Sequence, residues 1–530
     1  MKNFLLSLMT GWLCLCMNAY AQIVPGTMAN LKLGDQNYVK NNMMPSRIVG
    51  SDESGIYMVK VKLKHEIRAD HNFPVLEHYN DQMVLTKFRE LKVSNTETIP
   101  HFEGIIELGN HLYCFYSTVD KSSKTKTLIA QEINKQTLSL KEKTIPIQSL
   151  NYTGIPAYQS PEFHYKLSPN HQTLLISSQK KGTKNLENGF MFSVFDKNLS
   201  ETWSKEISSP FEKDHYSIEN YHITDKGEVF MLTKTVKTTK NLDIFWEPNY
   251  SFQILHIDKD KEEPQLIQPK IGGKFISKMQ IATKASGDLI CTGFYLDLAD
   301  SSQSGSYFLT LSKENNKIIH ADFQVFKPDR HSKDIPEGVS KENNAKSIFS
   351  YSFKDLVFRN DGSSVLIGEQ AIITSGNNPR NNIPGTKTSY NNISVTSIDP
   401  DGKIMWTEEI PKNQVSSAGY SFFSSFANIV LHDKIYFVFN DNPENLCEGP
   451  CKPVQFNPKS PKKEVLIALV ELDWNGNIKK SALPFSRDLN ILTKPGACEQ
   501  ISTHEMVILG QNNKSYQLAK LEFEKSFAYQ

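Results

Sequence analysis

Histidine and carboxylate side chains, which bind zinc in many proteins, gather in the segment HEIRADH (65–71). The helical zinc motif H-E-x-x-H is incomplete there, because Ala69 stands where the second histidine belongs. Two interpretations follow: a metal held in a loop, or polar residues surrounded by water. The second is favoured for the residues concerned, which are His65, Asp70, His71 and His78. We therefore predict no metal and no other cofactor.

Aromatic residues form a second candidate site in FWEPNY (245–250), beside a proline. Phe245, Trp246 and Tyr250 have the side chains that stack on a sugar ring or anchor a protein partner. The alternative is a hydrophobic plug that tethers its own loop. Arg380, in NNPRNN, can hold a carboxylate through two parallel hydrogen bonds. These four residues are the predicted binding residues, and no catalytic residue is predicted.

Five cysteines lie beyond residue 21, in a chain expected to meet an oxidising compartment. Cys447 and Cys451 bracket the polar segment CEGPC and are predicted to form a local disulfide. A metal site would need further thiols or histidines nearby in the sequence. Cys114 and Cys291 lie in apolar, strand-like runs and are predicted to be buried thiols. The fifth cysteine, Cys498, is assigned no role.

The chain begins MKNFLLSLMTGWLCLCMNAYAQ, with a lysine, an apolar run and an A-x-A site. This pattern predicts a signal peptide at 1–21, cleaved after Ala21, and hence export to the periplasm or beyond. A lipoprotein is not expected, because Leu13 and Leu15 precede the leader cysteines. No later segment is long and apolar enough to cross a membrane as a helix, so no transmembrane segment is expected.

Charge excludes one class of partner. The chain has 59 basic and 58 acidic residues; one basic residue, Lys2, lies in the leader, so 58 of each remain. A balanced charge supplies no long-range attraction for nucleic acid. The sequence also contains no P-loop, nucleophile elbow or dinucleotide-binding fingerprint.

The elements that must position these residues are short strands in pairs. Eight tight hairpins recur, and each except the last is followed by an apolar strand, a turn residue and another strand. The turn residue is usually Asp or Asn, as in IDPDGKIMW (398–406) and LDWNGNIKK (472–480). Glycine follows in both examples and supplies a positive φ. The predicted first strands of the eight hairpins begin at Arg47, Ile105, Tyr165, Tyr221, Met279, Leu356, Asn428 and Glu499.

Two hairpins per repeat make a four-stranded unit that cannot bury both of its faces alone, so the sequence predicts an all-β protein with a β-propeller fold. Eight blades are expected, with seven as the alternative. The eighth lacks its outer strand, which residues 23–44 can supply, so that the ring is closed by an N-terminal strand. The rest, 22–530, is one domain, with predicted blades at 45–98, 103–150, 163–210, 216–272, 276–328, 353–414, 424–488 and 496–525.

Long connections are expected on one face only. Antiparallel strands place the two hairpin turns of each blade on one side of the disc, and the other connections on the opposite side. The longest of the latter are 327–351, 371–392 and 441–463. Long loops on a rigid scaffold often carry binding residues, although loop length is also tolerated at small energetic cost.

Individual hairpins show a family likeness. LSPNHQTLLISS (167–178) resembles the repeat of WD40-like Tol-type propellers, and IDPDGKIMW resembles that of quinoprotein-type propellers. Each resemblance covers one hairpin. Together they imply a propeller in an envelope or extracellular setting, and the quinoprotein likeness implies eight blades. The adjacent cysteines and regular tryptophans of quinoproteins are missing, so no quinone chemistry is implied.

Three functions fit these observations. The first is an exported scaffold that binds a protein or an envelope polymer, a glycan included, through its long loops. The second is a hydrolase or lyase acting on polysaccharide at the central opening. The third is a structural envelope domain without a discrete ligand. The predicted first strands share no polar set that would converge on the axis, which favours binding over catalysis.

Overall fold

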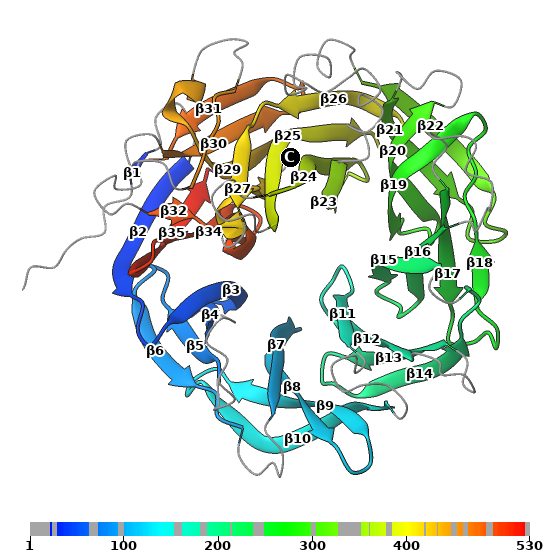
Figure 1. Cartoon of the computed structure of the whole chain (residues 1–530), viewed down its shortest axis with the longest axis horizontal. Helices are drawn as coiled ribbons and strands as arrows, with labels where there is room; N and C mark the ends of the chain where they lie inside the picture. The colour runs from blue at the N-terminus through cyan, green and yellow to red at the C-terminus, as the bar shows by residue number, and fades with distance from the viewer. Residues whose placement is uncertain are drawn as a thin grey trace, which may run out of the picture.

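Eight antiparallel sheets stand around a common axis in the computed structural model, with the first strand of each nearest the axis (Figure 1). The protein is an all-β propeller of eight four-stranded blades, so the predicted fold and blade number are confirmed. The structure describes residues 22–23, 29–62, 73–93, 100–152, 162–180, 188–212, 215–236, 249–297, 304–326, 351–359, 361–377, 384–417, 420–431, 433–446, 453–458, 465–483 and 491–524. The predicted signal peptide lies outside these residues.

The blades follow one another along the chain. Blades 1 to 4 consist of β3 (Met43–Asp52), β4 (Gly55–Lys62), β5 (Val75–Tyr79), β6 (Leu85–Glu90); β7 (His101–Leu108), β8 (His111–Asp120), β9 (Thr125–Asn134), β10 (Ser139–Asn151); β11 (Phe163–Leu167), β12 (Thr173–Lys180), β13 (Gly189–Asp196), β14 (Glu201–Ser208); and β15 (Tyr216–Ile223), β16 (Val229–Val236), β17 (Tyr250–Ile257), β18 (Gln265–Ile267).

Blades 5 to 7 consist of β19 (Lys274–Thr283), β20 (Leu289–Asp297), β21 (Ser304–Leu311), β22 (Ile318–Val325); β23 (Tyr351–Phe358), β24 (Ser364–Asn377), β25 (Pro384–Ile398), β26 (Ile404–Ile410) with the added strand β27 (Gln414–Ser417); and β28 (Ala427–Val430), β29 (Lys434–Asp441), β30 (Leu466–Asp473), β31 (Ile478–Ala482). The described helical turns are the 3-10 segments η4 (Ser421–Phe423), η5 (Pro443–Leu446) and η8 (Pro495–Ala497).

The two ends of the chain build blade 8 together. Its inner part is β32 (Leu492–Thr493) and β33 (Glu499–Gln500), followed by β34 (Glu505–Gln511) and β35 (Ser515–Phe523). The N-terminal strand β2 (Ala29–Tyr38) then pairs antiparallel with β35, and β1 (Gln22–Ile23) pairs with β2. The predicted closing strand is confirmed. It covers an edge that would otherwise offer unpaired backbone groups to other chains.

The core lies between blades, around the second and third strands of each. The first five residues of β16 and the first eight of β20 are buried, because neighbouring blades cover both faces of these strands. Such strands read as continuous apolar runs. Cys114 on β8 and Cys291 on β20 are buried thiols, as predicted. The outer strand β6, in contrast, is mostly exposed.

The turns between the third and fourth strands use the predicted side-chain chemistry. The side chain of Asp473 accepts a hydrogen bond from the backbone N–H two residues on, over 2.9 Å. The same bond forms at Asn80, Asn134, Asp196, Asp258 and Ser312. Asp399 instead accepts from Lys403, four residues on. Gly402 (φ 97°) and Gly476 (φ 84°) have the positive φ that these turns need.

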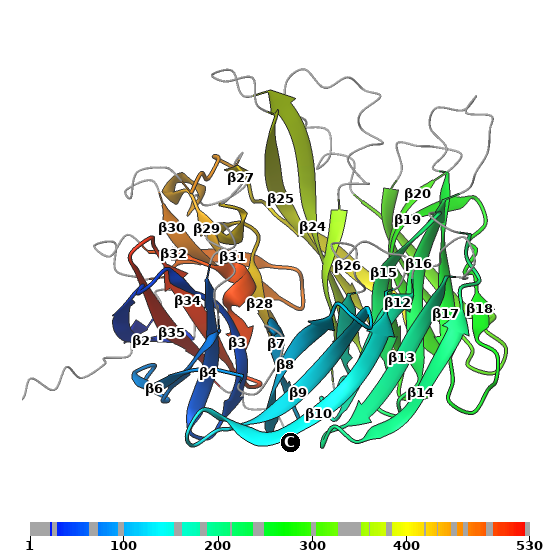
Figure 2. The same cartoon turned by 60° about the horizontal axis from the view of Figure 1, so that its bottom comes forward.

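The two faces of the disc differ. On the turn face, residues 53–54 join β3 to β4, and 109–110 join β7 to β8. On the opposite face, the loop face, connections such as 63–74 and 442–465 are much longer. One prediction is wrong here: 371–392 is largely a continuation of β24 and β25 and not a loop. These strands extend as a hairpin above the disc (Figure 2).

Candidate functional site

The blade-6 hairpin, described over residues 371–377 and 384–390, is a projecting feature of the loop face. β23 pairs with β24 only as far as Gln370, and β24 and β25 continue beyond it from the pair Ala371–Tyr390 to the pair Asn377–Pro384. A two-stranded hairpin without support is marginally stable in water. β27 supports this one by pairing with residues 387–390 of β25.

A buried ionic network holds the root of this hairpin. The carboxylate of Glu369, on β24, accepts hydrogen bonds from Lys412 Nζ at 2.7 Å and Ser425 Oγ at 2.7 Å. Lys354 Nζ lies 3.0 Å from the same carboxylate. Lys412 Nζ also donates to Gln414 Oε1 and to the backbone oxygen of Tyr390. The network therefore ties both hairpin strands and β27 to the segment that enters blade 7.

Burial and the neighbouring charges act in opposite directions on the pKa of Glu369 and on that of Lys412. Burial alone would raise the pKa of Glu369, but the charges of Lys412 and Lys354 outweigh burial and lower it. Burial lowers the pKa of Lys412, and the Glu369 carboxylate opposes that shift. A buried ion pair with further hydrogen bonds fixes the geometry of its surroundings more than it adds stability. The hairpin is thus rooted at a defined position on the disc.

The predicted binding residues fall largely outside the described part of the chain. This holds for Phe245, Trp246 and Arg380, and also for the predicted Cys447–Cys451 disulfide. Tyr250 is the first residue of β17, where its hydroxyl donates to the backbone oxygen of Ser277 at 3.1 Å. Its ring packs edge-on against Phe275 at 5.0 Å, so Tyr250 links blades 4 and 5.

Other residues singled out in the sequence have structural roles. His78 lies on β5, and its two ring nitrogens make hydrogen bonds with Ser54 and Thr86. Trp203 on β14 and Trp406 on β26 pack between blades. Trp203 Nε1 donates to the backbone of Gly227 in blade 4, and Trp406 Nε1 to that of Trp474 in blade 7. The remainder of the histidine-rich segment lies outside the described residues.

A second candidate site lies on the innermost strands, which line the ring centre (Figure 1). Blades 4 to 7 each place one amide or carboxylate side chain at the same level. These residues, which we call the polar arc, pair with the fourth residue of the second strand in their blades. The pairs are Asn220–Leu232, Gln280–Thr292, Asp355–Ile367 and Asn428–Phe437.

Two hydrogen bonds join the four residues of the polar arc into two pairs. Asn220 Nδ2 donates to Gln280 Oε1 at 2.8 Å, and Asn428 Nδ2 donates to Asp355 Oδ2 at 3.2 Å. Among the described residues, Gln280 Nε2 and Asn428 Oδ1 have no hydrogen-bond partner. The polar arc therefore keeps an unused donor at Gln280 and an unused acceptor at Asn428, beside the carboxylate of Asp355.

Charged residues of both signs surround the arc. Burial lowers the pKa of Arg47 (blade 1) and of Lys166 (blade 3), while the acids Glu499 and Asp355, respectively, oppose these shifts. Burial raises the pKa of Asp355; the Asn428 hydrogen bond and Lys166 act against it. Burial also raises the pKa of Glu499, with Asp355 adding to the rise. The side chains of Arg47 and Glu499 are exposed to solvent, but the surrounding blades exclude part of the water that would otherwise hydrate their charges.

The prediction that the first strands share no polar set is wrong, and for Asn220 and Asp355 β-bulges explain why. β15 and β23 begin five residues before their predicted starts at Tyr221 and Leu356. Asn220 and Asp355 directly precede those starts. A bulge lies next to each, between Ile218 and Asn220 and between Phe353 and Asp355. An extra residue shifts the period-two alternation, so the inward positions do not follow the expected pattern.

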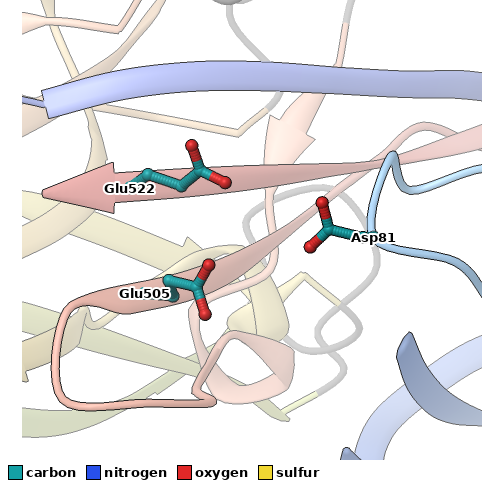
Figure 3. A group of neighbouring side chains, drawn as sticks. All are labelled: Asp81, Glu505 and Glu522. Atoms are coloured by element: carbon teal, nitrogen blue, oxygen red, sulfur yellow. The ribbon is translucent and has the colours of Figure 1, made fainter. Parts of the chain in front are cut away.

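An acidic cluster between blades 8 and 1 forms ion pairs with a lysine of the protein itself. Figure 3 shows Asp81, from a turn of blade 1, near Glu505 and Glu522 of blade 8, with oxygens of all three within 4.8 Å of one another. Lys520 Nζ contacts all three carboxylates and lies 2.9 Å from Glu522 and 3.2 Å from Glu505. Its ammonium group stands where a metal ion would bind, and the cluster fastens blade 8 to blade 1.

No protein-family model matches this sequence, and no curated protein does. Among solved structures, the chain is similar to the WD40 domain of SCAP from fission yeast, with 9% identity, 94% of this chain and 95% of that chain covered, and a TM-score of 0.39. It is also similar to the β-propeller domain of the Trilobed protease from Pyrococcus furiosus, with 8% identity, coverage of 83% and 96%, and a TM-score of 0.36. A protein of unknown function from Bacteroides caccae matches with 14% identity, coverage of 64% and 91%, and a TM-score of 0.27.

Likenesses at this level concern the propeller fold alone. The expectation of a propeller is confirmed by the sheet topology, and no family is assigned. In the described part of the chain, no helix has the length and apolar character needed to span a membrane.

Proposed function

We propose that the protein is an exported interaction scaffold that binds a protein or an envelope polymer through its loop face. The observation that carries this proposal is the blade-6 hairpin, which extends above the disc and is rooted by the buried network around Glu369. A rigidly held element loses little conformational entropy on binding, so it can form an interface at low cost. The neighbouring connections on the same face are long in sequence, and long loops on a rigid scaffold often carry binding residues.

Ile373 gives this surface an apolar contact point. It lies on the hairpin, and 70% of the residue is exposed. Apolar side chains of this size contribute to binding when a partner covers them. Ile319, on the outer strand β22 of blade 5, is 61% exposed and provides a matched position away from the loop face.

The experiment is a pull-down from envelope extract with the expected mature chain (22–530), read by mass spectrometry. In the test variant, residues 373–388 are replaced by Asn-Gly, which closes the hairpin directly after the Ile372–Ser389 pair. The control variant carries Lys226→Ser, Asp401→Ser and Asn475→Ser, all on exposed turns of the opposite face. We expect a partner that the wild type and the control capture and that the shortened variant loses. Equal capture by the shortened, folded variant would refute binding through the hairpin.

A further inference from the structure

The hydroxyl group of Ser54 lies between two proton acceptors on the turn face. Ser54 is an exposed residue of the turn that joins β3 to β4. Its Oγ lies 2.5 Å from Asp52 Oδ1 and 3.0 Å from Nε2 of His78, which is on β5 of the same blade. A serine hydroxyl within hydrogen-bond distance of a histidine nitrogen is the arrangement that activates serine as a nucleophile.

Thr86, on β6, orients the ring of His78. The Thr86 hydroxyl has one proton and donates it to the backbone oxygen of His78 at 3.0 Å, so it accepts a hydrogen bond from Nδ1 of the ring at 2.5 Å. With the ring proton on Nδ1, Nε2 carries the lone pair that faces Ser54. Burial lowers the pKa of His78, which favours this neutral form. His78 therefore has the orientation of a general base toward Ser54.

Two other turns show which part of this arrangement is ordinary. The pattern Asp-x-Ser occurs in turns at 52–54, 120–122 and 361–363, and in each the serine N–H donates to the aspartate. The serine hydroxyl donates to the same oxygen at 2.5, 2.6 and 2.5 Å, respectively. That bond is common turn chemistry. In the described part of the chain, the hydroxyls of Ser122 and Ser363 bond to their aspartates alone, so the histidine contact distinguishes Ser54.

Two further donors stand beside the nucleophile. The hydroxyl of Tyr57 lies 3.4 Å from Ser54 Oγ and donates to Asp52 Oδ2 at 2.9 Å. Lys135 Nζ, from a turn of blade 2, lies 3.3 Å from the same carboxylate oxygen. Donors at such positions can stabilise the oxygen that becomes negative when a nucleophile attacks a carbonyl group.

A cavity of about 350 Å³ borders the turn that carries Ser54, since its chain neighbours Glu53 and Gly55 both line it. Among the described residues that line this cavity, none is basic. An uncharged or cationic molecule is therefore favoured over an anion. The side chains that line it include Asp52, Asp81, Ile56, Met83 and Ile501.

We propose that Ser54 and His78 form an acyl-transfer site on the turn face, with Ser54 as the nucleophile, His78 as its general base and an uncharged or cationic ester as the substrate. Ser54 Oγ bonds to the carbonyl carbon while its proton passes to His78 Nε2. The bond to the alcohol oxygen breaks, and the alcohol leaves with that proton. A water molecule then attacks the acyl carbon in the same way, releases the carboxylic acid and restores Ser54. The site lies on the face opposite the blade-6 hairpin and does not depend on the function proposed above.

Covalent labelling tests this proposal, with Ser122 as the internal control. The expected mature chain (22–530) is incubated with diisopropyl fluorophosphate, whose phosphorus atom bonds to a nucleophilic serine oxygen as fluoride leaves. Mass spectrometry of peptides then gives the rate at each serine. Ser122 is exposed and makes the same bonds to its aspartate, but it has no histidine partner in the described part of the chain. We expect Ser54 to react at least about tenfold faster than Ser122, because a general base accelerates proton removal.

Variants assign the roles. Ser54→Ala should lose most of the hydrolysis of p-nitrophenyl acetate, whereas Ser122→Ala should keep it. His78→Gln, checked for folding by circular dichroism, should slow the labelling of Ser54 at least about tenfold. The comparison of Ser54 with Ser122 in the wild type needs no variant, so the test stands even where His78→Gln does not fold. Two results would overturn the proposal: equal labelling rates at Ser54 and Ser122, or hydrolysis by Ser54→Ala at the rate of the wild type.

Discussion

Lys412 Nζ lies 2.7 Å from Glu369 Oε1, and neither side chain is accessible to solvent. This pair joins the end of blade 6 to the root of its projecting hairpin. Each charge also has other partners. Ser425 and Lys354 contact Glu369, and Gln414 accepts a hydrogen bond from Lys412. The relationship explains how a feature outside the propeller core is held in place by that core.

Glu369→Gln should destabilise the protein strongly, because it leaves the ammonium group of Lys412 buried without its main counter-charge. We expect the free energy of unfolding to fall by about 3–5 kcal/mol, the usual cost of breaking a buried pair. Chemical denaturation measures it. The double variant Glu369→Met with Lys412→Met removes both charges and should lose less than the single variant. A single variant as stable as the wild type would show that Lys412 does not depend on the charge of Glu369 and would contradict this prediction.

Acid should weaken the fold through Glu103. Burial alone would raise the pKa of Glu103, but hydrogen bonds with His101 and Ser117 and the charge of Lys126 lower it from 4.5 to about 2. A carboxyl with a lowered folded pKa stabilises the protein above its ordinary pKa, and the benefit disappears as pH falls toward the folded value. Stability should therefore decline between pH 4.5 and 2. The free energy of unfolding, measured by denaturation at several pH values, should fall less steeply with decreasing pH in Glu103→Gln than in the wild type. An equal fall in both proteins would contradict this role of Glu103.

Loss of the closing strand should open the ring. Leu31 on β2 is fully buried and pairs with Leu521 of β35. Leu31→Asp puts an unpaired charge into this contact and should cost about 4 kcal/mol or more. Tyr38→Asp, at a residue of the same strand that is 63% exposed, should change stability by less than about 0.5 kcal/mol. Calorimetry compares the two; similar melting curves would contradict closure by β2.

The CEGPC segment should contain a disulfide between Cys447 and Cys451. Cys114, Cys291 and Cys498 are buried free thiols, which leaves these two as the pair for a local bond. Full reduction of the unfolded protein should raise its mass by about 2 Da, the two hydrogens that reopening one disulfide adds. Peptide mapping should place the change in the peptide containing 447–451. An unchanged mass would mean that both thiols are free.

The sequence carries the fold clearly because propeller strands are short, apolar and separated by turns with their own chemistry. Residues such as Asp196 and Asp473 mark the turns by local hydrogen bonds, which need no tertiary information. The closing strand could be predicted because blade 8 was one strand short.

The candidate sites were harder to predict. The blade-6 hairpin projects from the disc, so it lacks the apolar alternation that reveals a strand packed on a core, and its Asn, Gly and Pro residues suggested a loop. Asn220 and Asp355 of the polar arc were missed because the bulges beside them shift the alternation of the inner strands. A bulge depends on how a strand meets its neighbours, and a single sequence does not show that.

The most direct test of binding through the loop face compares two single substitutions. The partner captured by the wild type is purified, and its affinity is measured by calorimetric titration for the wild type, Ile373→Asp and Ile319→Asp. If the hairpin forms the interface, Ile373→Asp should weaken binding at least about tenfold, or 1.4 kcal/mol, while Ile319→Asp stays within about twofold of the wild type. Equal affinities for the two variants would contradict the proposed function.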